Sequence, residues 1–89
     1  MKKLRIHVQG KVQGVFFRLS VKEMADKLHV KGFAKNKIDG SVEVLLEGED
    51  GAVDKILEFC KRATGMVKIE KTTWKEERFV EDYDKFEVL

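Results

Sequence analysis

The residues best suited to chemistry lie in two short segments of this chain. Arg18 ends a run punctuated by glycines, and its guanidinium presents a planar set of N–H donors that matches two phosphate oxygens at once. Asn36 carries a side-chain amide, which both donates and accepts hydrogen bonds and can therefore hold a water molecule and aim it at an electrophile. These residue types could bind a phosphoryl group and hold a water molecule.

The segment that ends at Arg18 runs from an expected strand into an expected helix. It reads Val8-Gln9-Gly10-Lys11-Val12-Gln13-Gly14-Val15-Phe16-Phe17-Arg18. Successive backbone N–H groups in such a turn can converge on an anion, and a helix N-terminus adds free N–H groups and a positive dipole end. Gly10 and Gly14 permit backbone angles that a Cβ forbids. We therefore predict a phosphoryl cradle, although the spacing alone also fits an ordinary glycine-rich connection followed by a surface arginine.

Asn36 has a second interpretation, as a turn residue before the Asp39-Gly40 hairpin signal. Side-chain amides are scarce in this chain, since Asn36 is accompanied only by Gln9 and Gln13. Each of the three is therefore a candidate for a task that only an amide can perform. The same scarcity, beside abundant Lys and Glu, favours a heat-adapted source, although the absence of proline does not.

Apolar periodicity predicts the elements that must position these residues. Alternation over 4–8 indicates a first strand, and helical spacing over 17–28 indicates a first helix, with Ser20 as its N-cap two residues after Arg18. Strands are expected over 32–36 and 42–46. A second helix is expected to be capped by Asp50 and to end at Gly65.

The last third of the chain predicts two more strands. Val67 and Ile69 are out of phase with Thr72 and Trp74, so the strand over 67–74 needs a bulge near Glu70 or Lys71. Phe86 and Val88 suggest a short terminal strand. The order predicts an α+β fold, the ferredoxin-like βαββαβ sandwich, with two helices packed on one face of a mainly antiparallel sheet. We expect residues 1–89 to form a single domain.

Composition excludes several classes of function. With 43% hydrophobic and 38% charged residues the chain is that of a globular protein, and no apolar run approaches the roughly 20 residues of a membrane span. A single cysteine suits a reducing compartment, so a cytoplasmic protein is expected. The net charge of +2 is too small to indicate nucleic acid, although residues 1–22 contain no acid and could present a positive field to an anion.

Two patterns in the chain resemble those of the acylphosphatase family. Residues 8–18 fit aliphatic-x-Gly-x-Val-Gln-Gly-Val-x-Phe-Arg at every fixed position. Residues 32–48 fit Gly-aromatic-small-x-Asn-x-x-x-Gly-x-Val followed by Gly six residues later, with Phe33 where many members have Trp. Five of the seven glycines are those that the two patterns require. The resemblance extends over essentially the whole chain.

The resemblance implies a metal-independent hydrolase, without a cofactor, that cleaves small acyl phosphates. Arg18 and Asn36 would be its catalytic residues, with Asn36 positioning the water. The phosphate would be bound by the backbone amides of Gln13, Gly14, Val15, Phe16, Phe17 and Arg18. A monomer is the family expectation, with neither nucleic acid nor membrane as a partner. The physiological acyl phosphate is not specified by the sequence.

Other residue types fit chemistry less well. We expect Cys60 to be a small core residue, and neither His7 nor His29 belongs to a metal-ligand cluster. An RNA-recognition fold shares the strand and helix order, and Lys31-Gly32-Phe33-Ala34 imitates the start of its signature, but the aromatic continuation is missing. An inactive regulatory domain is the third alternative.

Overall fold

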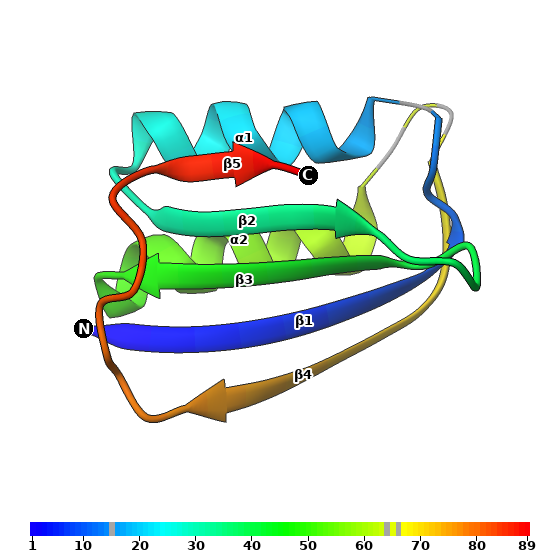
Figure 1. The fold of residues 1–89 in the computed structure, drawn as a ribbon. Coiled ribbons are helices and arrows are strands. Elements are labelled where there is room, and N and C mark those ends of the chain that lie inside the picture. Colours follow the sequence, from blue (N-terminus) through cyan, green and yellow to red (C-terminus); the bar gives the residue numbers. More distant parts are fainter. Residues whose placement is uncertain (15, 64, 66) are drawn as a thin grey trace.

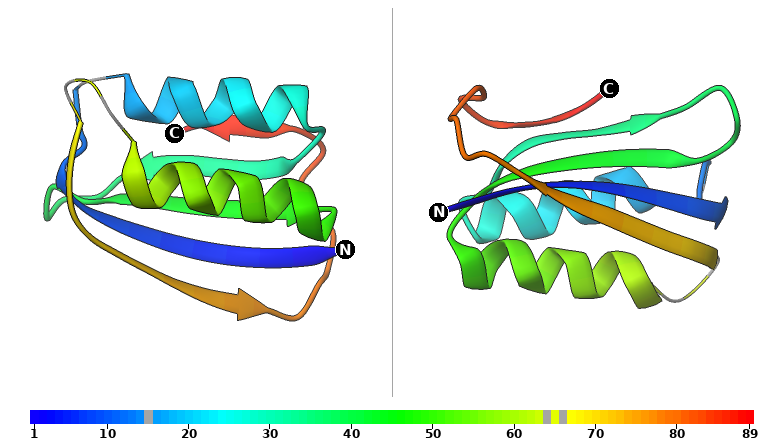
Figure 2. Two further views of the ribbon diagram at one scale, coloured as in Figure 1. Left: turned by 180° about the vertical axis from the view of Figure 1, so that it is seen from behind. Right: turned by 90° about the horizontal axis from the view of Figure 1, so that it is seen from below.

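The chain folds into two helices on a five-stranded sheet. The structure, a computed structural model, describes residues 1–14, 16–63, 65 and 67–89. Its elements are β1 (Lys2–Lys11), α1 (Phe17–Lys27), β2 (Lys31–Asn36), β3 (Val42–Gly48), α2 (Asp50–Arg62), β4 (Lys68–Glu77) and β5 (Phe86–Val88). The strand order is β4-β1-β3-β2-β5, and only the β2–β5 pair is parallel. Both helices cover the same face (Figures 1 and 2), which confirms the predicted ferredoxin-like arrangement.

The core lies between the helices and this face of the sheet. Leu4, Ile6 and Val8 are buried at alternate positions of β1, as a strand with one covered face requires. The helices contribute buried residues at helical spacing: Phe17, Val21 and Ala25 from α1, and Val53, Ile56, Leu57 and Cys60 from α2. Burial of each large aliphatic or aromatic side chain contributes about 1.5–3 kcal/mol. The hydrophobic periodicity of the sequence therefore predicted the core correctly.

The predicted bulge in β4 is present. Gln9 pairs with Lys71, whereas the next residue of β1, Gly10, pairs with Ile69, so Glu70 is the extra residue. Such an insertion changes the phase of the alternation. It explains why the apolar positions before and after Glu70 did not fit one strand period.

Both predicted helix caps were wrong. α1 begins at Phe17, three residues before Ser20, because Phe16 adopts left-handed angles (φ 61°, ψ 17°) and turns the chain directly into the helix. The Ser20 hydroxyl therefore lies inside the first turns and donates to the Phe16 carbonyl at 3.1 Å. Glu49 occupies the N-cap position of α2, and Asp50 is the first helical residue. α2 ends at Arg62, three residues before Gly65.

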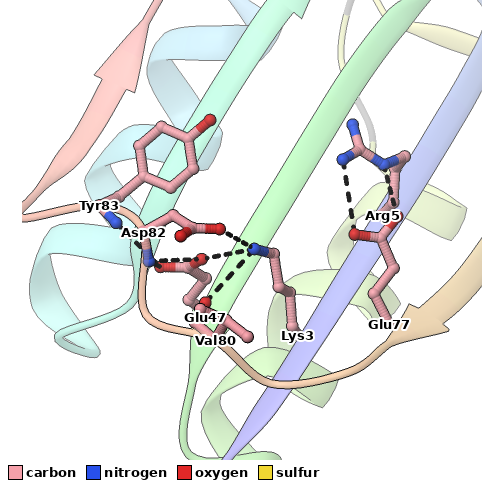
Figure 3. Close-up of polar contacts among 7 residues, drawn as sticks. All are labelled: Lys3, Arg5, Glu47, Glu77, Val80, Asp82 and Tyr83. Carbon is pink, nitrogen blue, oxygen red and sulfur yellow. Dashed lines mark hydrogen bonds and ion pairs between the residues drawn. The ribbon is translucent and has the colours of Figure 1, made fainter.

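The opposite face of the sheet, the open face, is crossed by residues 78–85, which we call the strap. Lys3 and Glu47 lie beneath it, with their side chains only 8% and 1% exposed and their charged atoms 3.0 Å apart. Glu47 also accepts backbone N–H groups of Asp82 and Tyr83 at 3.2 Å, and Lys3 donates to Asp82 at 2.6 Å (Figure 3). The strap thus leads the chain from β4 at one edge to β5 at the other.

Candidate functional site

The loop between β1 and α1 turns through left-handed backbone at two described positions. Gly14 has φ 73° and Phe16 has φ 61°. Before the loop, Gly10 has φ 135°, and a Cβ built on it would lie 2.0 Å from the Lys68 carbonyl oxygen. The predicted need for glycine at 10 and 14 is confirmed. Of the predicted backbone donors, Val15 lies outside the described residues.

The N-terminus of α1 is free to receive an anion. The N–H groups of the first turn have no acceptor within a helix, and the positive dipole end lies there. In the described part of the chain, no side chain caps this end and no acidic residue lies in its first turn. α2, in contrast, has Asp50 in its first turn. The sequence predicted backbone N–H groups of this loop as phosphate donors. Those that the structure describes lie beside the positive end of the α1 dipole, which no acidic side chain of the first turn neutralises.

Arg18 lies in the first turn of α1, at the end of the molecule where β2 also ends (Figure 1). Its side chain is half-buried, and Nη1 donates to the main-chain oxygen of Leu89. Leu89 is held in turn by its N–H, which donates to the Ala34 carbonyl of β2 at 2.9 Å. A hollow of about 220 Å³ is lined by Val12, Gly14, Phe16, Phe17, Arg18 and Leu19. The loop, the start of α1 and the end of β5 are therefore brought together here.

Asn36 is the last residue of β2, where it pairs with Val42 of β3. Its side-chain oxygen, Oδ1, is buried and has no hydrogen-bond partner among the described residues. A buried polar oxygen without a partner costs about 1–3 kcal/mol, so most such atoms in folded proteins are satisfied. The acceptor capacity of this oxygen is therefore unused within the described residues.

Gln13 links the loop to the hairpin that follows Asn36. Its side-chain Nε2 donates to the carbonyl oxygens of Lys37 at 2.8 Å and Ser41 at 2.9 Å. The scarcity of amides marked the Gln13 side chain as a candidate for a task that only an amide can perform, and its backbone N–H was predicted to bind phosphate. The sequence did not identify the two carbonyl partners of its side chain.

Asp39 and His7, the titratable side chains in contact with Ser41 of the hairpin, each form a hydrogen bond with it. Ser41 is buried, and its N–H and hydroxyl both donate to the Asp39 carboxylate, which lowers the Asp39 pKa below its ordinary value of 3.8. His7 Nε2 lies 2.7 Å from the Ser41 hydroxyl oxygen. The His7 ring therefore has a hydrogen-bond partner in this turn.

The other residues weighed from the sequence lie outside the site. Cys60 is completely buried, and burial raises the pKa of its thiol to about 12. His29 has φ 58° just beyond the end of α1. The Lys61 ammonium lies over the Trp74 ring, with its nitrogen 4.8 Å from the ring centroid. In the part of the chain that the structure describes, no three His, Cys, Asp or Glu residues cluster as metal ligands, and no helix could cross a membrane.

Two features of the open face bear on alternative functions. A larger hollow of about 330 Å³ includes Arg5 and Lys37, but Arg5 is paired with Glu43 and Glu77, and Lys37 lies 3.7 Å from Glu43. Phe33, the aromatic residue of the RNA-like segment, is only 8% exposed and packs edge-on against Tyr83 at 5.7 Å. It is therefore not a free platform for base stacking.

Comparison with known proteins gives a consistent result. The sequence matches the family model described as acylphosphatase over residues 4–88. It is 43% identical over 76 residues to an acylphosphatase of Rubrobacter xylanophilus, covering 85% of this chain and 69% of the relative. It is 37% identical over 89 residues to that of Bacillus subtilis, covering 100% and 98%.

Solved structures agree with the sequence comparison. The crystal structure of acylphosphatase from Bacillus subtilis superimposes with a TM-score of 0.93 at 37% identity, covering 100% of this chain and 99% of that one. An acylphosphatase structure from Coxiella burnetii gives a TM-score of 0.89 at 35% identity, covering 99% and 92%. The likeness extends over the strands, helices and loops described above.

Proposed function

The chain belongs to the acylphosphatase family, and from this premise we propose how its residues hydrolyse an acyl phosphate to a carboxylate and inorganic phosphate. Arg18 and the backbone amides from Gln13 to Arg18, Val15 included, hold the phosphoryl group. Asn36 holds the attacking water. Small acyl phosphates are the substrate class, and the enzyme works as a cytoplasmic monomer without a nucleic-acid or membrane partner.

The single observation that carries this proposal is the unpartnered Oδ1 of Asn36. It is buried at the end of β2 without a hydrogen-bond partner among the described residues, at the end of the molecule where α1 begins (Figure 1). A water that donates to this oxygen has a lone pair free to attack phosphorus. An asparagine serving only as a turn residue would be expected to satisfy its own side chain locally.

The reaction needs few protein groups. The water oxygen bonds to phosphorus as the bond from phosphorus to the acyl oxygen breaks, and the bonding pair leaves with the carboxylate. A carboxylate is a weak base, so its departure needs no general acid. The water proton passes to a phosphoryl oxygen. The transition state for phosphoryl transfer is loose, so positioning and charge stabilisation by Arg18 and the loop N–H groups supply most of the catalysis.

The first test uses benzoyl phosphate as substrate. We expect release of phosphate at an undiminished rate in excess EDTA, because the proposed donors are a guanidinium and N–H groups. Inorganic phosphate should inhibit competitively because it occupies the same cradle. A rate that returns only when a divalent metal is added would contradict the assignment.

The second test is Asn36→Ala. The turnover number should fall while KM and the inhibition constant of phosphate stay nearly constant, the signature of an interaction made mainly in the transition state. Gln9→Ala, which changes an exposed amide of β1, should leave both parameters unchanged. A stable Asn36→Ala protein with normal turnover would remove Asn36 from the mechanism.

A further inference from the structure

The side chain of Gln13 forms a direct polar link between the two halves of the site. It leaves the loop after β1, and its Nε2 lies 2.8 Å from the carbonyl oxygen of Lys37 and 2.9 Å from that of Ser41. Lys37 follows Asn36 directly, and Ser41 precedes Val42, the residue that pairs with Asn36 in the sheet. Both bonds therefore end beside the residue that holds the water.

The two contacts account for the residue type at this position. A side-chain NH₂ group has two protons, and here each is directed to a different carbonyl oxygen. A carboxylate of the same shape has no proton to donate and would repel both oxygens. A methionine has nearly the same length but no donor. Only a neutral amide of this length matches the pair without adding a charge.

The hairpin does not depend on Gln13 for its own closure. The Lys37 N–H donates to the Ser41 carbonyl at 2.8 Å, and the Gly40 N–H donates to the Lys37 carbonyl at 3.1 Å. The Ser41 N–H donates to the Asp39 carboxylate at 2.9 Å. Loss of the Gln13 amide would leave these bonds in place. It would release only the connection between the hairpin and the loop.

We propose that Gln13 is a positioning residue that fixes Asn36, and with it the attacking water, relative to the phosphoryl group. The inference rests on the proposed function and extends it to a side chain that does not touch the reacting atoms. The linking amide belongs to Gln13, the first of the residues whose N–H groups are proposed to hold the phosphoryl group. Any movement of the hairpin away from this amide changes the distance and angle between water and phosphorus.

The decisive variant is Gln13→Met, compared with Gln9→Met as a matched control on β1. In Gln13→Met the turnover number should fall about 10- to 100-fold, the usual effect of a small misplacement of reacting groups. The inhibition constant of inorganic phosphate should stay nearly constant, because the backbone donors remain. Gln9→Met should show normal values for both. Thermal melting of both proteins shows that the measured molecules are folded.

A double variant separates positioning from a general loss of structure. If Gln13 acts through Asn36, adding Gln13→Met to Asn36→Ala should cause little further loss of turnover, because there is no longer a held water to misplace. If Gln13 supports the site by another route, the two losses multiply. Multiplying losses would overturn the proposal.

Gln13→Glu gives a second readout, which applies even if Gln13→Met is unstable. Its carboxylate repels the two carbonyl oxygens at neutral pH, whereas its protonated form can donate one hydrogen bond. Turnover relative to wild type should therefore rise as the pH falls through the ordinary range of a glutamate, about 4.3. Gln9→Glu should show no such rise. A flat relative profile for Gln13→Glu would overturn the proposal.

Failure of this inference can be told apart from failure of the proposed function. Normal turnover in Gln13→Met together with a slow Asn36→Ala would reject Gln13 alone. A wild-type protein that does not hydrolyse benzoyl phosphate would reject the proposed function itself, whereas a fully active Asn36→Ala would remove Asn36, and with it the positioning role of Gln13, from the mechanism. Loss of phosphate affinity in Gln13→Met as large as its loss of turnover would assign Gln13 to binding and overturn the positioning role.

Discussion

Arg18 uses only part of its guanidinium in the structure. One nitrogen donates to the main-chain oxygen of Leu89, and the other N–H groups have no partner within the described residues. A guanidinium has five donors in a fixed plane, so this contact can orient the group and leave a fork for two phosphate oxygens. The geometry of the donors should therefore matter as much as their charge.

Arg18→Ala is expected to lower kcat about 10²–10³-fold, or about 2.7–4 kcal/mol, because a donor to developing charge is lost. Arg18→Lys should also be poor, since an ammonium cannot form the fork. Steady-state kinetics with benzoyl phosphate measure both, with Arg78→Lys in the exposed strap as a control. Full activity in Arg18→Lys would mean that charge alone matters.

Cys60 should be chemically inert in the folded protein. Its thiol is buried on α2, and burial raises its pKa to about 12, so almost no thiolate exists at pH 8. Iodoacetamide at pH 8 should modify the native protein very slowly and the urea-unfolded protein rapidly, as mass spectrometry would show. Rapid labelling of native protein, with loss of activity, would contradict this assignment.

At the scale of elements, the site depends on how closely β1 and β4 approach at the bulge. Gly10 lies opposite Ile69, at the point where the register shifts, and its φ of 135° is rarely accessible to other residues. β1 leads from this point directly into the loop. A change at Gly10 therefore affects both the sheet and the direction in which the loop leaves it.

Gly10→Ala should lower the free energy of unfolding by about 1–3 kcal/mol or more, since its Cβ would meet the Lys68 carbonyl oxygen at 2.0 Å in strained backbone. Gly51→Ala is the matched control, because Gly51 lies within α2, where an added Cβ would have open space around it. That change should instead add about 0.5–1 kcal/mol. Urea unfolding measures both, and a neutral Gly10→Ala would argue against the close approach.

At the scale of the whole molecule, the strap ties the edges of the sheet together across the open face. The buried Lys3–Glu47 pair holds it through Asp82 and Tyr83 (Figure 3). The hydrogen bond to Asp82 raises the pKa of Lys3 above its ordinary 10.5. β5 follows the strap and carries the chain to Leu89, the partner of Arg18. The segment that the buried pair contacts therefore continues to the residue that Arg18 contacts.

Lys3→Met should lower the free energy of unfolding by about 3–5 kcal/mol, because Glu47 would remain buried without its counter-ion. Lys2→Met, which removes a pairing with the half-exposed Asp54, should have a small effect. Since the folded pKa of Lys3 is raised, its contribution is complete below pH 10.5 and is lost as the pH rises through the raised value. Equal losses in the two variants, measured by urea unfolding, would contradict this account.

Heat adaptation stays a prediction. Besides the scarcity of amides, linked ion pairs join Arg5 to Glu43 and Glu77 and Lys3 to Glu47 and Asp82. Such networks stabilise proteins mainly at high temperature. We expect a melting temperature above the range of about 45–65 °C that is usual for mesophile domains. A calorimetric midpoint within that range would contradict the expectation.

The sequence by itself determined those features that depend on neighbours within a few residues. Alternation and helical spacing predicted the strands, the helices and their buried faces, because one side of each must be apolar. The break in phase predicted the bulge at Glu70, which the structure confirms. The glycine positions and the family patterns pointed to Arg18 and Asn36 as the site residues, a prediction that awaits the variants above.

Only the tertiary structure decided the contacts between distant segments. The Gln13 amide donates hydrogen bonds to Lys37 and Ser41, which lie 24 and 28 positions further along the chain. Arg18 donates to Leu89 across 71 positions, and Glu47 accepts from the Asp82 N–H across 35 positions. The left-handed Phe16, after which α1 begins, also has no signal in the apolar pattern. The apolar periodicity of the sequence shows which face of a helix or strand is buried, but it does not show which polar groups form hydrogen bonds with one another. The packing of the elements brings such groups together, and the requirement that buried polar atoms find partners then selects their bonds.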